Sequence, residues 1–368
     1  MGRVIPHRGV RGILSSMSHE SARKKYLKRP PEKILVVKPS SLGDVVHSLP
    51  FLNAIRTCFP GAKIDWVIAK GLEGLLEGNP MIDRLIVIDK DKWKKISRAS
   101  STLAELKDLL RRVGKGQYDL AVDLQGLMRS GLITAASRAP VRIGFSEARE
   151  GSRFFYNWKV AGGRNVNAVD RYLKVAAALA CATDNNVFPF PRARTAFEEA
   201  EKLRRELGDY VVVVPGARWE TKIWPAEFFG RVVSLLPLRS VVVGSAADAG
   251  IAGRVVAASG GKALSLAGKT DIRGLIEIMR GAKLAISNDS GPMHIAAAFG
   301  VPVVAVFGPT SAERTGPYGA RSVIVRNEVL ECAPCFRKKC GDPKCMSGVS
   351  PEDVLRKAME LLEAGGLS

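Results

Sequence analysis

Long apolar runs are missing from this sequence. No stretch of about 18 apolar residues occurs, the length that a membrane-spanning helix requires. The N-terminus also has no continuous apolar segment of the signal-peptide kind. We therefore expect a cytoplasmic protein that does not cross a membrane. Two nucleotide-binding patterns are missing as well, because neither a GxGxxG loop nor a Walker loop is present, which disfavours a dehydrogenase or a P-loop nucleotidase.

Acidic residues are scarce relative to basic ones. The chain has 36 Asp and Glu against 56 Lys and Arg, a formal charge of +20. Such a balance predicts an acidic partner: nucleic acid, an anionic membrane or a phosphorylated substrate. A non-catalytic nucleic-acid-binding protein is one alternative, but aromatic residues are only 7% of the chain and no recognition motif is visible. Part of the charge lies near the N-terminus, and we expect a mobile basic arm over residues 1–32.

Six cysteines are present, and they fall into two groups. Cys58 and Cys181 stand alone in apolar, helix-like surroundings and are expected to be separate core residues. The others cluster in the stretch CAPCFRKKCGDPKC, where two readings stay open: reduced thiols or a structural zinc site. Disulfides are not expected in a reducing compartment. The clustered cysteines are Cys332, Cys335, Cys340 and Cys345.

Strand-like and helix-like segments alternate along the whole chain of 368 residues. This alternation predicts an α/β fold with mostly parallel sheets and helices on both faces. The length favours two domains, and a proline-rich linker around Pro189 and Pro191 separates two series of strands. We predict two Rossmann-like, doubly wound domains, 33–190 and 191–368, that face a central cleft.

The stretch KPSSLGDVVHSLP at 38–50 follows the first strand of the N-terminal domain. Turns at the carboxyl ends of strands are where open α/β sheets bind ligands, and the following helix N-terminus attracts anions. Asp44 in this turn is either a helix cap or a base. Ser40, Ser41 and Gly43 precede it and are candidates for positioning a ligand.

Polar turns follow three strands of the C-terminal domain. Arg218 and Lys222 come after VVVVP and suit a diphosphate, although a solvated basic loop would look the same. Asp248 follows another strand and is either a ribose ligand or a helix cap. The turn NDSGPMH offers hydroxyl and N–H groups to a phosphate; the alternative is a capping Asp289 beside a surface histidine. Its candidate donor residues are Asp289, Ser290, Gly291 and His294.

Four motifs together resemble the lipopolysaccharide heptosyltransferases. They are KPSSLGDVVHSLP, DLQGLMRSG at 123–131, PGARWETKIWP at 215–225 and SNDSGPMHIAAAFGVPVVAVFGPT at 287–310. The resemblance runs from about residue 33 to the C-terminus. GDVVHSLP and IDWVI are similar to heptosyltransferase I, whereas the cysteine-rich tail is similar to heptosyltransferase II. The resemblance implies glycosyltransferase family 9, the two-domain GT-B arrangement and inverting transfer.

The resemblance also implies substrates and residue roles. The donor is ADP-L-glycero-D-manno-heptose, the acceptor is Kdo-lipid A, and neither a metal nor another cofactor is required. Asp44 is the general base, and we favour this role over a cap because the anion-binding turns lie in the other domain. Arg218 stands where some members carry a threonine, and Arg129 stands where the family has a basic residue facing the acceptor. Lys222, His294, Ser290, Gly291 and Asp289 hold the donor.

A lipid acceptor implies that the enzyme works at an anionic surface, the inner face of the inner membrane. We expect basic residues, and not an apolar anchor, to bind it there. We expect no nucleic-acid partner and predict no particular oligomer. Candidate surface contacts are the basic arm, the stretch KDKWKK at 90–95 and the loop with Arg149 and Arg153.

Overall fold

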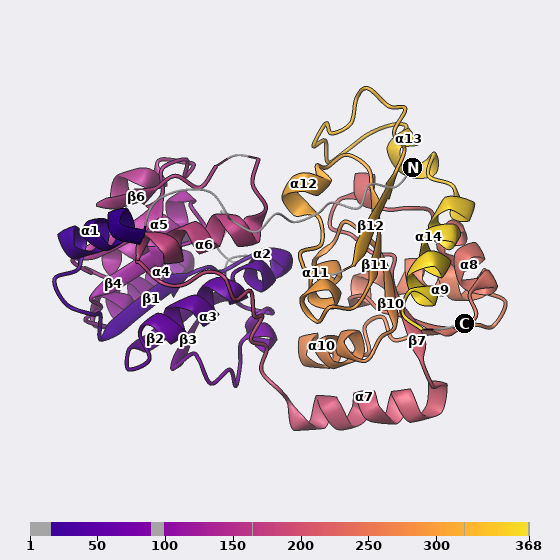
Figure 1. Ribbon diagram of the computed structural model, residues 1–368, viewed down its shortest axis with the longest axis horizontal. Helices are drawn as coiled ribbons and strands as arrows, with labels where there is room; N and C mark the ends of the chain where they lie inside the picture. The colour runs from indigo at the N-terminus through magenta and orange to yellow at the C-terminus, as the bar shows by residue number, and fades with distance from the viewer. Residues whose placement is uncertain (1–15, 90–98, 164, 320, 367–368) are drawn as a thin grey trace. The chain divides into compact units, whose positions relative to one another are not determined.

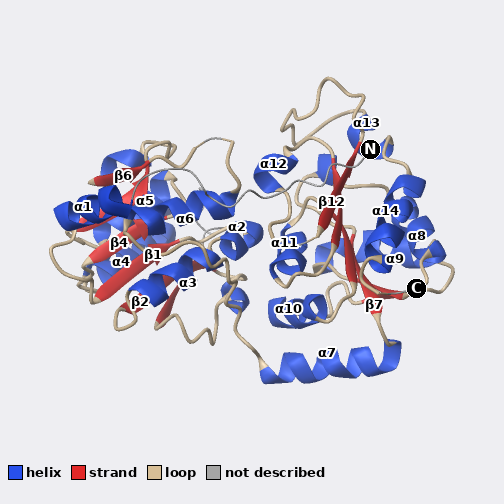
Figure 2. Cartoon of the chain, viewed as in Figure 1, coloured by secondary structure: helices blue, strands red, loops and turns tan. Residues whose placement is uncertain are grey.

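The computed structural model describes residues 16–89, 99–163, 165–319 and 321–366. The chain divides into two compact units, of which the first ends at Pro191 and the second begins at Arg192 (Figure 1). Each unit is built on one six-stranded sheet, with helices on both faces (Figure 2). No helix in these described ranges is both long enough and apolar enough to cross a membrane.

The N-terminal unit has the strand order β3-β2-β1-β4-β5-β6, and every pairing is parallel. Its strands are β1 (Lys33–Val37), β2 (Lys63–Ala69), β3 (Arg84–Ile88), β4 (Leu120–Asp123), β5 (Val141–Phe145) and β6 (Trp158–Val160). Its helices are α1 (Ser16–Tyr26), α2 (Leu42–His47), α3 (Leu49–Cys58), η1 (Glu73–Leu75), α4 (Ala99–Gly114), α5 (Met128–Ala136), η4 (Ser152–Phe155) and α6 (Ala168–Ala178).

The C-terminal unit repeats this topology, with the order β12-β11-β10-β7-β8-β9. Its strands are β7 (Tyr210–Val214), β8 (Arg239–Val242), β9 (Ala263–Ser265), β10 (Leu284–Asn288), β11 (Val303–Phe307) and β12 (Ser322–Arg326). Its helices are α7 (Arg194–Leu207), η5 (Glu220–Lys222), α8 (Ala226–Leu235), η6 (Ala246–Asp248), α9 (Ala249–Ala257), α10 (Ile272–Arg280), α11 (Gly291–Ala298), α12 (Ala312–Thr315), α13 (Lys344–Ser347) and α14 (Pro351–Glu363).

The central strands of both sheets are buried on both faces, which is why they read as continuous apolar runs. All five residues of β7 are buried, as are four of the five in β1. In each sheet the strand order reverses beside the first strand, between β1 and β4 and between β7 and β10. This topology confirms the predicted pair of doubly wound folds. Ligands of such sheets bind at the carboxyl ends of the strands beside the reversal.

Part of the segment predicted as a basic arm, residues 1–32, is helical. Residues from Ser16 form α1, whose last residue, Tyr26, stacks on Trp158 with ring centroids 4.5 Å apart. The Arg23 guanidinium lies 5.0 Å from the Phe59 ring centroid. The helix has no strong apolar period, so these aromatic contacts with the rest of the unit could not be seen in the sequence. Residues 1–15 and the KDKWKK stretch lie outside the described residues.

Cys58 and Cys181, which we expected to be isolated core residues, form a disulfide with each other. Cys58 ends α3 and Cys181 follows α6, and these two helices pack against each other. Their Cα atoms are 5.4 Å apart although 123 positions separate them in the chain. That separation is why the pairing could not be inferred from local context.

Candidate functional site

The turn after β1 places Asp44 in the first turn of α2, where it completes a capping box with Ser41. The Ser41 backbone N–H and hydroxyl both donate to Asp44 Oδ2, at 2.9 and 2.7 Å. Gly43 is buried in the same turn. Asp44 therefore caps the helix through Oδ2. The capping alternative does not explain the position of Oδ1.

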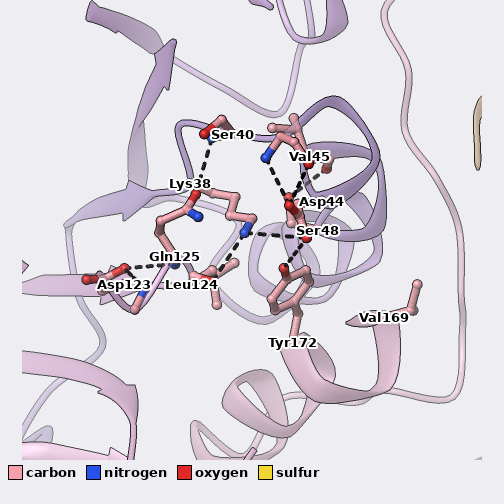
Figure 3. Close-up of polar contacts among 12 residues, drawn as sticks. Lys38, Ser40, Asp44, Val45, Ser48, Asp123, Leu124, Gln125, Val169 and Tyr172 are labelled. Carbon is pink, nitrogen blue, oxygen red and sulfur yellow. Dashed lines mark hydrogen bonds and ion pairs between the residues drawn. The ribbon is translucent and has the colours of Figure 1, made fainter. Parts of the chain in front are cut away.

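The second carboxylate oxygen of Asp44 faces two other side chains. Oδ1 lies 4.0 Å from Lys38 Nζ and 3.4 Å from the Tyr172 hydroxyl, which donates to it (Figure 3). Burial acts to raise the pKa of Asp44, but the Lys38 charge and the Ser41 hydrogen bonds outweigh it and lower that pKa below its usual range. The Asp44 side chain is still 40% exposed. It is thus an ionised carboxylate that a ligand can reach.

Lys38 is the buried partner of Asp44. Its side chain is only 3% exposed, and Nζ lies 3.5 Å from the Leu124 carbonyl and 5.0 Å from the Tyr172 ring centroid. Burial lowers the pKa of Lys38, and the charges of Asp44 and Asp123 oppose that effect. We did not predict Lys38 or Tyr172 as site residues. A lysine directly after the apolar run ILVV was the available signal for Lys38, whereas no local pattern marked Tyr172.

The turn after β4 is tied to the turn that carries Asp44. The Gln125 side-chain oxygen accepts from the Ser40 N–H at 3.3 Å. Asp123 Oδ1 accepts from the N–H groups of Gln125 and Gly126, at 2.8 and 2.9 Å, and its Oδ2 accepts from the Tyr156 hydroxyl at 2.6 Å. These bonds fix the start of α5, where the predicted acceptor residue Arg129 is exposed. The predicted acceptor residues therefore occupy two linked turns at one sheet edge.

In the C-terminal unit, the structure brings together Lys222 and Asp289. Lys222 Nζ lies 2.6 Å from Asp289 Oδ2, and the Thr310 hydroxyl donates to the same oxygen at 2.5 Å. The Lys222 ammonium also lies 4.7 Å from the Trp219 ring centroid. Asp289 is 5% exposed and Lys222 is 16% exposed. Lys222 is therefore not a freely solvated basic residue, because a buried carboxylate fixes its position.

Two further contacts join the loops around this pair. The Asn288 side chain donates to the Pro215 carbonyl at 2.7 Å and accepts from the Trp224 N–H at 3.2 Å. Asp248 lies against Gly216 so closely that a Cβ at Gly216 would collide with its carboxylate. The turns after β7, β8 and β10 are therefore held together at one edge of the sheet.

The other predicted donor residues differ in exposure. Ser290 is the N-cap of α11, which begins at Gly291, and His294 is buried. The surface-histidine alternative is therefore wrong. Arg218 is exposed. Asp248 forms a capping box with Ser245, whose hydroxyl donates to it at 2.7 Å, so the capping alternative describes its contacts.

The four clustered cysteines lie at or near the protein surface. Cys332, Cys335 and Cys340 are exposed, and burial raises the pKa of the half-buried Cys345 thiol. Within the described ranges, no group of three or more His, Cys, Asp or Glu side chains is arranged to hold a metal ion. Both alternatives for this cluster, reduced thiols and a structural zinc site, stay predictions.

Comparisons with known proteins agree on one family. Residues 106–346 match the family "Glycosyltransferase family 9 (heptosyltransferase)". The Pseudomonas aeruginosa protein "Lipopolysaccharide heptosyltransferase 1" is 32% identical over 318 residues, which cover 84% of this chain and 87% of that protein.

Two solved structures also resemble the chain. A glycosyltransferase of family 9 from Veillonella parvula is 28% identical, with a TM-score of 0.77 over 90% of this chain and 97% of that one. The E. coli heptosyltransferase WaaC, solved with ADP, is 26% identical, with a TM-score of 0.73 over 89% of this chain and 99% of that one. The chain therefore belongs to glycosyltransferase family 9, the heptosyltransferases, and is a glycosyltransferase built from two Rossmann-like units.

Proposed function

We propose that this enzyme transfers L-glycero-D-manno-heptose from ADP-heptose to Kdo-lipid A, the step that adds the first heptose to the lipopolysaccharide core, with inversion at the anomeric carbon. The observation that carries the proposal is the reachable, ionised carboxylate of Asp44 at the carboxyl end of β1. The membership of the chain in family 9 and its 32% identity to a heptosyltransferase 1 support the choice of substrates.

The proposed reaction has one covalent step. The acceptor hydroxyl oxygen attacks the anomeric carbon of the heptose, the bond from that carbon to the diphosphate oxygen breaks, and ADP leaves with the electron pair. The proton of the attacking hydroxyl passes to Oδ1 of Asp44, since Oδ2 is occupied by Ser41. Ser41 thus orients the base, and Ser40, Gly43 and Arg129 remain the proposed acceptor contacts.

The proposed donor site lies in the C-terminal unit. Lys222, held by Asp289, supplies a fixed positive charge to the diphosphate leaving group. The N-terminus of α11, with Ser290 and Gly291, offers N–H groups to the same anion. We also assign Arg218, Asp248 and His294 to the donor, with Asp248 toward the ribose.

We further propose that the enzyme works in the cytoplasm, at the anionic inner face of the inner membrane. The excess of 20 positive charges supports this location, because each basic residue near such a surface contributes about 1 kcal/mol.

The direct test is to incubate the protein with ADP-heptose and Kdo-lipid A and to read the product by mass spectrometry. A gain of one heptose is expected. A parallel reaction offers the acceptor that already carries one heptose. Because the cysteine-rich tail is similar to heptosyltransferase II, a product only from that second acceptor would assign the chain to that activity. No product from either acceptor, together with DNA retention at moderate salt, would favour the nucleic-acid alternative.

A further inference from the structure

Three apolar side chains of the N-terminal unit are exposed on neighbouring elements. Phe154 in η4 is 75% exposed, and Met128 and Leu132, one turn apart on α5, are 40% and 36% exposed. A Cβ built at Gly151 would lie 3.3 Å from Met128 and 3.8 Å from Phe154, so these two side chains are neighbours. Scattered exposed apolar residues are ordinary, whereas grouped ones mark interaction sites. We call this group the Phe154 patch.

The patch is held in place by the elements beneath it. Gly131 on α5 has no room for a side chain, because a Cβ there would collide with Phe155 and approach Ser152. The Ser152 hydroxyl donates to the Arg149 carbonyl at 2.8 Å, and the Met128 N–H donates to a Glu150 carboxylate oxygen at 3.2 Å. Helix α5 and η4 therefore form one packed unit, and the apolar side chains are displayed from a fixed platform.

Basic side chains surround the apolar ones. Arg129, Arg149 and Arg153 are all exposed, and the Arg153 guanidinium lies 5.1 Å from the Phe154 ring centroid. Of the nearby acids, Glu147 makes internal contacts, since its two oxygens accept backbone N–H groups of Gly162 and Gly163 at 3.0 Å each. Glu150 is exposed, so the three arginines outnumber one exposed acid. The patch thus combines an apolar centre with a positive rim, the composition that suits an anionic lipid–water interface.

The Phe154 patch is also connected to the acceptor turns. The Arg149 N–H donates to the Gly126 carbonyl at 2.9 Å, and the neighbouring Gln125 accepts from Ser40 in the turn that carries Asp44. Loop 146–151 follows β5, and the turn at 124–127 follows β4, so both lie at the sheet edge that carries Asp44. A surface docked on the patch would therefore lie beside the position proposed for the acceptor.

We propose that the Phe154 patch docks the enzyme on an anionic phospholipid bilayer, with Phe154 and Met128 inserted among the headgroups and Arg149 and Arg153 on lipid phosphates. The choice of a bilayer rests on the proposed function, because that acceptor is a membrane lipid. Charge complementarity selects anionic over neutral lipid. Net charge alone would attract the enzyme to the membrane surface without fixing its orientation. The proposed patch adds an apolar insertion point that fixes the orientation.

Binding to vesicles tests the patch directly. Full-length protein is co-sedimented with vesicles of phosphatidylglycerol and phosphatidylcholine, and with phosphatidylcholine alone. We expect Phe154→Ser to weaken binding to the anionic vesicles about tenfold, from the lost burial of one aromatic side chain. Arg153→Gln should weaken it about fivefold, and only at low salt. The matched control is Leu235→Ser, an exposed apolar residue at the end of α8 that is 58% exposed.

The outcomes separate this proposal from the proposed function. Equal binding by Phe154→Ser and Leu235→Ser, or no binding of the unchanged protein to anionic vesicles at low salt, would overturn the patch whatever the enzyme transfers. Transfer assays give the second readout: Phe154→Ser should slow transfer to acceptor embedded in anionic vesicles and leave transfer to a deacylated, water-soluble acceptor unchanged. Equal loss on both acceptors would mean that Phe154 acts within the acceptor site and not on the bilayer. Absence of transfer by the unchanged protein would refute the proposed function, and the vesicle comparison would still decide the patch.

Discussion

Each unit carries a lysine–aspartate pair at the carboxyl ends of its central strands, and the two pairs are built in opposite ways. In the N-terminal unit the lysine is buried and the carboxylate is open: Lys38 is 3% exposed and Asp44 is 40% exposed, with 4.0 Å between them. In the C-terminal unit the carboxylate is buried and the lysine is the more open partner: Asp289 is 5% exposed and Lys222 is 16% exposed, at 2.6 Å.

This inversion separates the chemistry of the two turns. A buried ammonium beneath an open carboxylate keeps a proton acceptor ionised and within reach of a ligand. A buried carboxylate behind a more open ammonium fixes a positive charge for an anion. The same two residue types therefore suit the two roles that we propose, base and diphosphate clamp, depending on which of them the fold buries.

The largest effect is expected at the open carboxylate. Asp44→Asn keeps the Ser41 cap but cannot take a proton, so turnover should fall by about 10²–10⁴-fold. The measurement is the rate of heptose transfer at saturating substrates. The matched control is Asp353→Asn, which changes a second Ser–Asp cap. There Ser350 is the N-cap of α14, and its hydroxyl accepts from the Asp353 N–H at 3.1 Å. Near-normal turnover in Asp44→Asn would remove Asp44 from the mechanism.

The second effect is expected at Lys222, the more exposed partner of the C-terminal pair. Lys222→Ala should weaken ADP binding about 10–100-fold, the contribution of one charge-assisted hydrogen bond, and leave acceptor binding unchanged. His294→Ala should weaken it less. Calorimetric titration with ADP measures both. Lys338→Ala is the control, since Lys338 also lies over the Trp219 ring, at 5.5 Å. Unchanged ADP affinity in both Lys222→Ala and His294→Ala would place the donor elsewhere.

These two sites could be predicted from the sequence because their signals are local. Asp44, Lys222 and Asp289 each stand in a polar turn directly after an apolar strand, and the strand–helix alternation predicted the doubly wound sheets. Partners that come from distant segments could not be predicted. Tyr172 reaches Asp44 from 128 positions away, and the disulfide that links α3 to the end of α6 spans 123. Which partner of each pair is buried depends on these tertiary contacts, so the inversion was not visible in the sequence.

The third effect concerns the buried lysine. Asp44 must be ionised to take a proton, so activity is lost as the pH falls through its lowered pKa. Lys38→Met removes the charge that lowers this pKa and leaves the burial that raises it. The acid limb of kcat/KM should therefore move to higher pH, by about one to three pH units. Lys33→Met, at the opposite end of β1 and also over a tyrosine ring, should not move it. An acid limb that stays in place in Lys38→Met would mean that Lys38 does not set the ionisation of Asp44.

The smallest effect is expected at Tyr172. Its hydroxyl donates to Asp44 over 3.4 Å, a long bond, and burial together with Asp44 raises the pKa of Tyr172 well above its ordinary value, so it remains a donor. Tyr172→Phe keeps the ring over Lys38 and removes only this bond. We expect about a threefold loss in kcat/KM and a slight shift of the acid limb to higher pH.

The comparison with Tyr156→Phe sharpens this last prediction. Tyr156 also donates to an aspartate, Asp123, but this bond is 2.6 Å long and buried. Its loss should lower the melting temperature, because it leaves the Asp123 carboxylate oxygen without that donor, and should leave the acid limb where it is. If Tyr172→Phe moved the acid limb as far as Lys38→Met, the hydroxyl and not the buried ammonium would control Asp44. The contrast between the two lysine–aspartate pairs would then no longer explain the base.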